Sequence, residues 1–109
     1  MAYDEALADR VREVLGPVAD VSERKMFGGL AFLIAGNMAC GIVGQDLMLR
    51  LGEERADAAL DEPHVRPMDF TGRPMKSMVY VAAAGIATRD SLEIWVGRGV
   101  EFAAGLPPK

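Results

Sequence analysis

The segment 24–51, RKMFGGLAFLIAGNMACGIVGQDLMLRL, is the part of the chain that most constrains its fold. Its apolar runs are interrupted at Gly28-Gly29, Gly36-Asn37 and Gly44-Gln45, and short apolar runs between such pairs predict a three-stranded antiparallel meander. The segment contains almost no chemically reactive side chains. It therefore predicts a scaffold and does not indicate a reaction.

The turn positions also predict which side chains share a face of the sheet. If Gly36-Asn37 is a two-residue turn, Ala35 pairs with Met38, Leu33 with Cys40 and Phe32 with Gly41; a similar turn at Gly44-Gln45 pairs Ile42 with Leu47 and Cys40 with Leu49. One face then collects Ala31, Leu33, Ala35, Met38, Cys40, Ile42, Leu47, Leu49 and Leu51, which we expect to be the core under the helices.

The other face is also apolar, although Asp46 and Arg50 interrupt it. When one face of an antiparallel sheet is open to water, apolar and polar residues normally alternate along each strand, and the polar ones lie on the open face. Either the chain itself covers this second face or another protein does. We take it as a candidate interaction surface, made of Leu30, Phe32, Ile34, Val43 and Met48, with Phe32 as the natural anchor because Gly41 opposite leaves space for a ring.

The remaining elements complete an α+β domain. Helical periodicity covers residues 3–15, a short acidic helix covers 52–60, and Thr88 is a plausible N-cap for a final helix. A brief strand around 68–71 precedes a strand over 76–83. The predicted order is α-β-β-β-α-β-β-α, in one domain of residues 1–109 with two layers: an antiparallel sheet and helices on one face.

The inventory of reactive side chains predicts neither catalysis nor a cofactor. With one histidine, His64, and one cysteine, Cys40, the chain cannot assemble a zinc set from nitrogen and sulfur ligands. We interpret His64 as a solvated loop residue and Cys40 as a small core residue. Ser22 and Lys25 have the spacing of some acyl-transfer enzymes, but the further motifs of those enzymes are missing. We therefore expect no enzyme and no metal.

Four basic residues could form a cationic surface if the long connection folds beside the first strand. They are Lys25, Arg66, Arg73 and Lys76, and together they would hold a phosphate or an acidic partner. Scattered solubilising charge is the alternative that we favour. The net charge of −4 argues against a dedicated nucleic-acid binder. If the four basic residues do converge, a nucleic-acid-associated accessory domain is a second hypothesis. A small-ligand-binding protein is a third.

The sequence predicts a cytoplasmic protein. A lone cysteine forms no internal disulfide, which favours a reducing compartment. The N-terminal residues are acidic and amphipathic, unlike a secretion signal, and no run of 18 apolar residues occurs.

Several short motifs occur along the chain: Lys25-Met26-Phe27-Gly28-Gly29, Gly36-Asn37-Met38-Ala39, Asp46-Leu47-Met48-Leu49-Arg50, Met68-Asp69-Phe70, Gly72-Arg73-Pro74-Met75, Met78-Val79-Tyr80 and Leu92 with Trp95-Val96. Together they resemble the N-terminal domain of the TfoX/Sxy competence regulators. The resemblance covers nearly the whole chain and is to a stand-alone form, because the second, helical domain usual in that family has no counterpart before Lys109.

That resemblance implies a small α+β fold similar to secretion-chaperone-like domains, which often dimerise through their sheet. It also implies a regulatory role in DNA uptake, exercised with a cyclic-AMP-dependent transcription activator, and it carries no catalytic residues. Our leading hypothesis is therefore a non-enzymatic regulatory module that acts through protein contacts as a homodimer.

Overall fold

The computed structural model describes residues 3–26, 28–70 and 73–108 and shows three α-helices and six strands within them. In chain order these are α1 (Glu5–Leu15), β1 (Val21–Met26), β2 (Gly29–Ile34), β3 (Asn37–Val43), β4 (Asp46–Arg50), α2 (Glu53–Ala59), β5 (Val65–Phe70), β6 (Arg73–Val81), a 3-10 turn at Ala83–Ile86, and α3 (Arg89–Ala104).

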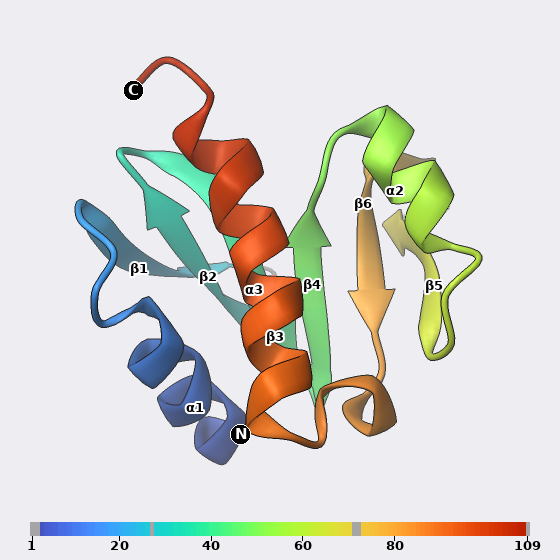
Figure 1. The fold of residues 1–109 in the computed structure, drawn as a ribbon, viewed down its shortest axis with the longest axis horizontal. Helices are drawn as coiled ribbons and strands as arrows, with labels where there is room; N and C mark the ends of the chain where they lie inside the picture. Colours follow the sequence, from blue (N-terminus) through green and yellow to red (C-terminus); the bar gives the residue numbers. More distant parts are fainter. Residues whose placement is uncertain (1–2, 27, 71–72, 109) are drawn as a thin grey trace.

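The strands form one antiparallel sheet in the order β1-β2-β3-β4-β6-β5, and all three helices lie on the same side of it (Figure 1). The predicted α+β class, with helices on one face of an antiparallel sheet, is confirmed. The order differs by one element, because four strands precede α2 where three were predicted. The additional strand is β1, whose residues 22–25 are polar and exposed, so hydrophobic patterning did not mark it as a separate strand.

The β2–β3 hairpin turns one residue earlier than predicted. Ala35 and Gly36 occupy the turn with φ of 49° and 86°, and Ile34 pairs with Asn37. A bulge beside Phe32 and Leu33 then pairs Phe32 with Cys40, where Gly41 had been expected. The predicted β3–β4 pairs, Ile42 with Leu47 and Cys40 with Leu49, are confirmed.

A one-residue slip in register moves side chains to the other face of a sheet. Leu30 and Phe32, which were predicted for the open face, belong to the main core cluster under the helices, together with Cys40. Ile34, predicted for the same face, packs with Ala103 of α3 in a neighbouring cluster. These three residues of the predicted interaction surface are therefore core residues, and that part of the prediction is wrong.

Helix α3 lies directly on the sheet because a glycine permits close approach. Thr88 caps its first turn, as predicted, and its hydroxyl accepts a hydrogen bond from the Ser91 amide at 3.1 Å. Gly99 faces β3 so closely that an added Cβ would lie 2.5 Å from the carbonyl oxygen of Ala39. The obstacle is backbone, which cannot move aside as a flexible side chain could.

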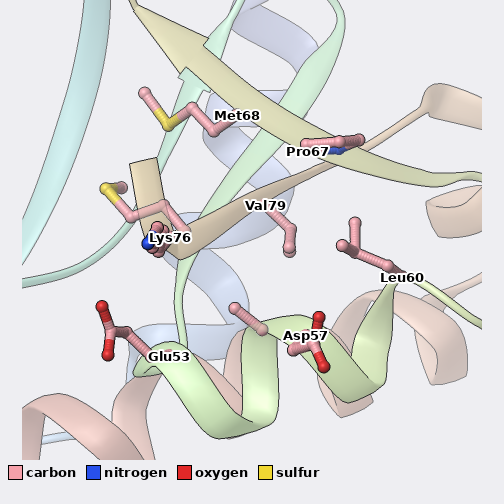
Figure 2. A pocket seen from close by; sticks show the side chains of 9 residues that line it. Glu53, Asp57, Leu60, Pro67, Met68, Lys76 and Val79 are labelled. Atoms are coloured by element: carbon pink, nitrogen blue, oxygen red, sulfur yellow. The ribbon is translucent and has the colours of Figure 1, made fainter. Parts of the chain in front are cut away.

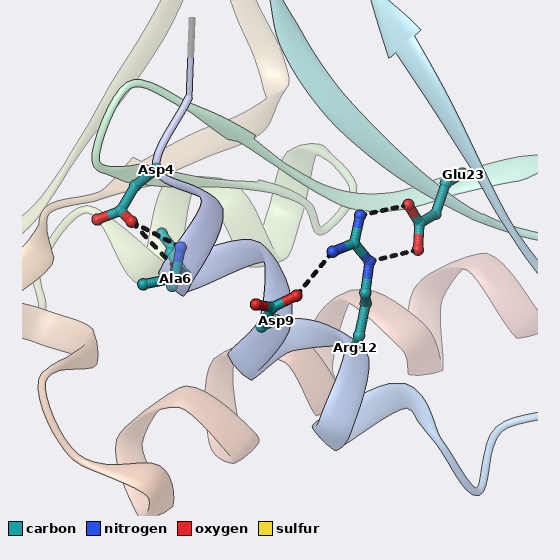
Figure 3. Close-up of polar contacts among 6 residues, drawn as sticks. Asp4, Ala6, Asp9, Arg12 and Glu23 are labelled. Carbon is teal, nitrogen blue, oxygen red and sulfur yellow. Dashed lines mark hydrogen bonds and ion pairs between the residues drawn. The ribbon is translucent and has the colours of Figure 1, made fainter. Parts of the chain in front are cut away.

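Helix α1 is fastened at its start and along its exposed side (Figure 3). The Asp4 carboxylate accepts hydrogen bonds from the amides of Ala6 and Leu7, at 2.9 and 3.2 Å. Two nitrogens of the Arg12 guanidinium donate to the Glu23 carboxylate of β1, at 2.7 and 2.8 Å, and a third donates to Asp9 at 2.8 Å. The bidentate pair joins α1 to the edge strand, and the hydrogen bonds from Arg12 lower the pKa of Glu23.

We predict that Gly99→Ala lowers the free energy of unfolding by about 1 to 3 kcal/mol, because the new methyl group overpacks the contact between α3 and β3. Urea denaturation measures this change. Gly97→Ala is the matched control, since an added Cβ there meets nothing within 4 Å. The control should be neutral or stabilising by up to about 1 kcal/mol, because alanine is the better helix former. Equal effects of the two substitutions would contradict the close-packing interpretation.

We predict that Arg12→Met costs less than about 1 kcal/mol of unfolding free energy at neutral pH, because the pair with Glu23 is exposed. The Glu23 pKa is lower in the folded chain than in the unfolded one, so its stabilisation is present above the unfolded pKa of about 4.3 and is lost as the pH falls through the folded pKa. Urea titrations of both proteins near neutral pH and at about pH 3 should therefore show the difference shrinking in acid. A difference that stays constant would exclude this ion pair as its source.

Candidate functional site

A cluster of methionines lies on the sheet face that carries no helix. Leu47 and Leu49 of β4 belong to the core under the helices, so Met48 between them points to the opposite face. Met48 packs there with Met68 of β5 and Met78 of β6, and all three are buried, while the bordering Met38, Val43 and Tyr80 are half-buried. We call these six residues the methionine face. Two of them, Val43 and Met48, were part of the predicted interaction surface.

Strand pairing explains how this cluster is built. Met48 is paired with Gly41 on one side and with Tyr80 on the other. The missing side chain of Gly41 leaves room for the methionine, because an added Cβ would lie 2.5 Å from the Met48 Cε methyl. Methionine is unbranched and polarisable and adapts its shape to irregular contacts. The result is a closely packed cluster of adaptable side chains, in which the three central methionines are buried and only the bordering residues are partly exposed.

Charged residues border the methionine face on the β5 side. Arg66 of β5 forms an ion pair with Asp46 of β4, and its guanidinium lies over the Tyr80 ring, 4.7 Å from the ring centre. The hydrogen bond to Asp46 raises the pKa of Arg66. This arginine is therefore committed to contacts within the chain.

The strand order does not bring the four predicted cationic residues into one group. Lys25 lies on β1 and Arg66 on β5, which are the opposite edges of the sheet. Lys76 lies on β6 beside a cavity under α2, and the side chain of Arg73 falls outside the described residues. The prediction of a single surface that includes Lys25 is therefore corrected by the topology.

The side chains with reactive potential lie apart from one another. Cys40 is fully buried in the core, as predicted, and burial raises the pKa of its thiol to about 12. His64 is exposed in the turn before β5, with φ of 68°. Among the described residues, no three histidine, cysteine, aspartate or glutamate side chains are placed to hold a metal ion.

Sequence reasoning missed Met68 as a member of the methionine face, because Pro67 and the neighbouring prolines made its segment look irregular. Met78 and Tyr80 were detectable, since they alternate with the core residues Val79 and Val81. The alternation showed a shared face but not that this face carries no helix.

The family model of the TfoX N-terminal domain matches residues 13–103 of the 109-residue chain, so the chain belongs to this family. Comparison with curated proteins and with solved structures found no match. No helix within the described residues combines the length and apolar character needed to cross a bilayer.

We predict that Cys40 does not react with Ellman's reagent in the folded protein on the time scale on which the same chain in guanidinium is fully labelled. Two causes act together: the side chain has no exposed surface, and its raised pKa leaves almost no thiolate at neutral pH. The absorbance of the released thiol product measures both rates. Comparable rates in the two states would show that the core around β3 opens readily.

Proposed function

We propose that this chain is a regulatory protein-interaction module that forms a homodimer through its methionine face. The observation that carries the proposal is an apolar sheet face on which no helix packs, centred on Met48, Met68 and Met78. Membership in the TfoX N-terminal domain family supports a regulatory role connected with competence. The family resemblance extends the proposal to a transcription-regulatory protein as a further partner, in the cytoplasm.

The chemistry of the face suits association with another protein. Its border residues Met38, Val43 and Tyr80 keep part of their surface exposed, so a partner would remove further apolar area from water. Methionine-rich surfaces adapt to partners because the side chain has several rotatable bonds. The ion pair of Arg66 with Asp46 adds a polar border to an apolar centre, which is the usual arrangement of protein interfaces.

A second copy of the chain is the simplest occupant of this surface. A two-fold axis through the face would place the same apolar residues of both copies against each other, as in the isologous interfaces of most homodimers. The net charge of −4 adds only a weak long-range repulsion between copies at physiological salt, because charges are screened over about 8 Å.

We predict that Val43→Asp and Met38→Asp each raise the dimer dissociation constant by at least about tenfold, because each buries an unpaired carboxylate in the interface. Sedimentation velocity over a micromolar concentration series measures the constant, and urea denaturation confirms that each variant is folded. Both positions are half-buried in one chain, so the substitutions leave the main core intact.

Ile94→Asp is the matched control, since Ile94 is the most exposed of the large apolar side chains that the structure describes, at 56%, and lies on α3 in the helical layer. It should leave the dissociation constant unchanged. A wild-type chain that stays monomeric throughout the series would refute the proposal. Dissociation caused by Ile94→Asp, with no effect of Val43→Asp, would indicate that the interface lies on the helical layer.

A further inference from the structure

A cavity of about 470 Å³ lies between α2 and the strands β5 and β6 (Figure 2). Its size falls within the range of sites that bind small molecules. On the helix side the cavity is lined by Glu53, Ala56 and Asp57 of α2 and by Leu60, which follows it. On the sheet side it is lined by Pro67, Met68, Lys76, Met78 and Val79 of the two strands. It is separate in position from the border residues Met38, Val43 and Tyr80 of the methionine face.

The cavity lies beside an irregularity in strand pairing. Pro67 pairs with Val79, but the next residue, Met68, pairs with Met75, so residues 76–78 of β6 have no register partner on β5. On its other side this stretch remains attached to the sheet, because the Ser77 carbonyl oxygen accepts hydrogen bonds from the amides of Leu51 and Gly52, at 2.9 and 3.1 Å. Residues 76–78 of β6 therefore form a bulge opposite β5, and α2 packs against β6.

The cavity has a polar end and an apolar end. Glu53 is the first residue of α2 and Leu60 follows its last turn, so they mark opposite ends of the helix. In the view of Figure 2, Lys76 lies toward the same end as Glu53, whereas Pro67 lies toward the end of Leu60, with Val79 between. Asp57, one helical turn after Glu53, adds a second carboxylate farther along the α2 wall, and in this view it lies closer to Leu60 than to Glu53, while Met68 lies on the side of Lys76.

The charges at the polar end are separated between two walls. The Glu53 carboxylate comes from α2, while the Lys76 ammonium comes from β6, and both side chains are exposed at this end. Neither Glu53 nor Asp57 forms an ion pair with Lys76 or with any other residue that the structure describes. A ligand that enters this end thus meets a carboxylate that accepts hydrogen bonds on the α2 side. On the β6 side it meets the Lys76 ammonium, which donates them.

We propose that this cavity binds a small zwitterion with an apolar body, of the class of α-amino acids with apolar side chains. The ligand ammonium would lie against Glu53, its carboxylate against Lys76, and its side chain along Val79 toward Leu60 and Pro67. The inference is independent of the proposed dimerisation.

Charge complementarity distinguishes this class from its alternatives. A neutral apolar molecule would desolvate the polar end without replacing its hydrogen bonds, which is costly. A ligand with only a carboxylate meets the Glu53 carboxylate of α2, and one with only an ammonium meets Lys76. A zwitterion supplies an opposite charge to each wall, and charge-assisted hydrogen bonds are the stronger kind.

The test is a titration of the chain labelled with ¹³C at the methionine methyl groups. Met68 and Met78 line the cavity, so their methyl resonances should shift when L-leucine or L-phenylalanine is added at millimolar concentration, whereas the resonance of Met38 reports on the surface outside it. The matched probes 2-phenylethylamine, which lacks the carboxylate, and 3-phenylpropanoate, which lacks the ammonium, should bind at least about tenfold more weakly than L-phenylalanine.

Glu53→Gln and Lys76→Met should each weaken binding of L-phenylalanine by about tenfold, because each removes one charge from the polar end. Glu54→Gln is the control, since Glu54 is exposed on the same helix and does not line the cavity. The proposal is overturned if neither amino acid shifts the Met68 and Met78 resonances, if either singly charged probe binds as tightly as the zwitterion, or if Glu54→Gln weakens binding as much as Glu53→Gln. A monomeric wild-type chain would refute the proposed dimer and leave this titration unaffected.

Discussion

The register of the β2–β3 hairpin is the constraint on which the rest of the structure depends. Ala35 and Gly36 both have positive φ in its turn, and the bulge beside Phe32 adds one residue to β3. This combination directs Phe32 to the helices, together with Cys40 and the branched side chains of β4. Since side chains alternate along a strand, the same register decides what remains for the opposite face.

The two faces of the sheet consequently differ in their chemistry. The helix side is filled by branched aliphatic and aromatic residues, which pack rigidly, and α3 approaches it as closely as Gly99 allows. The other side is filled by thioether side chains, which conform to what they contact. A rigid core on one face therefore supports adaptable side chains on the other, which suits the protein-interaction role proposed above.

Much of this arrangement was predictable from the sequence, and the failures have physical causes. The β3–β4 register followed from Gly44, because its turn needs positive φ and no competing turn was nearby. At the preceding turn, Gly36-Asn37 was the pair that best tolerates positive φ. The turn instead begins at Ala35, which has a φ of 49°, because the resulting register buries Phe32. Tertiary packing overrode the local preference there. The cavity could not be predicted, because it lies beside an interruption between β5 and β6 that no local pattern marks.

The methionine face and the cavity meet at two residues. Met68 and Met78 belong to the apolar cluster on the helix-free face and also line the opening under α2, so a single layer of thioether side chains lies between the two surfaces. The pairing irregularity after Pro67 lies where these two surfaces meet, because it falls between Met68 of β5 and residues 76–78 of β6. The residues that characterise each surface are nevertheless distinct: Val43 does not line the cavity, and Glu53 does not belong to the face. The proposed dimer surface and the proposed ligand cavity thus share Met68 and Met78 but differ in their other residues.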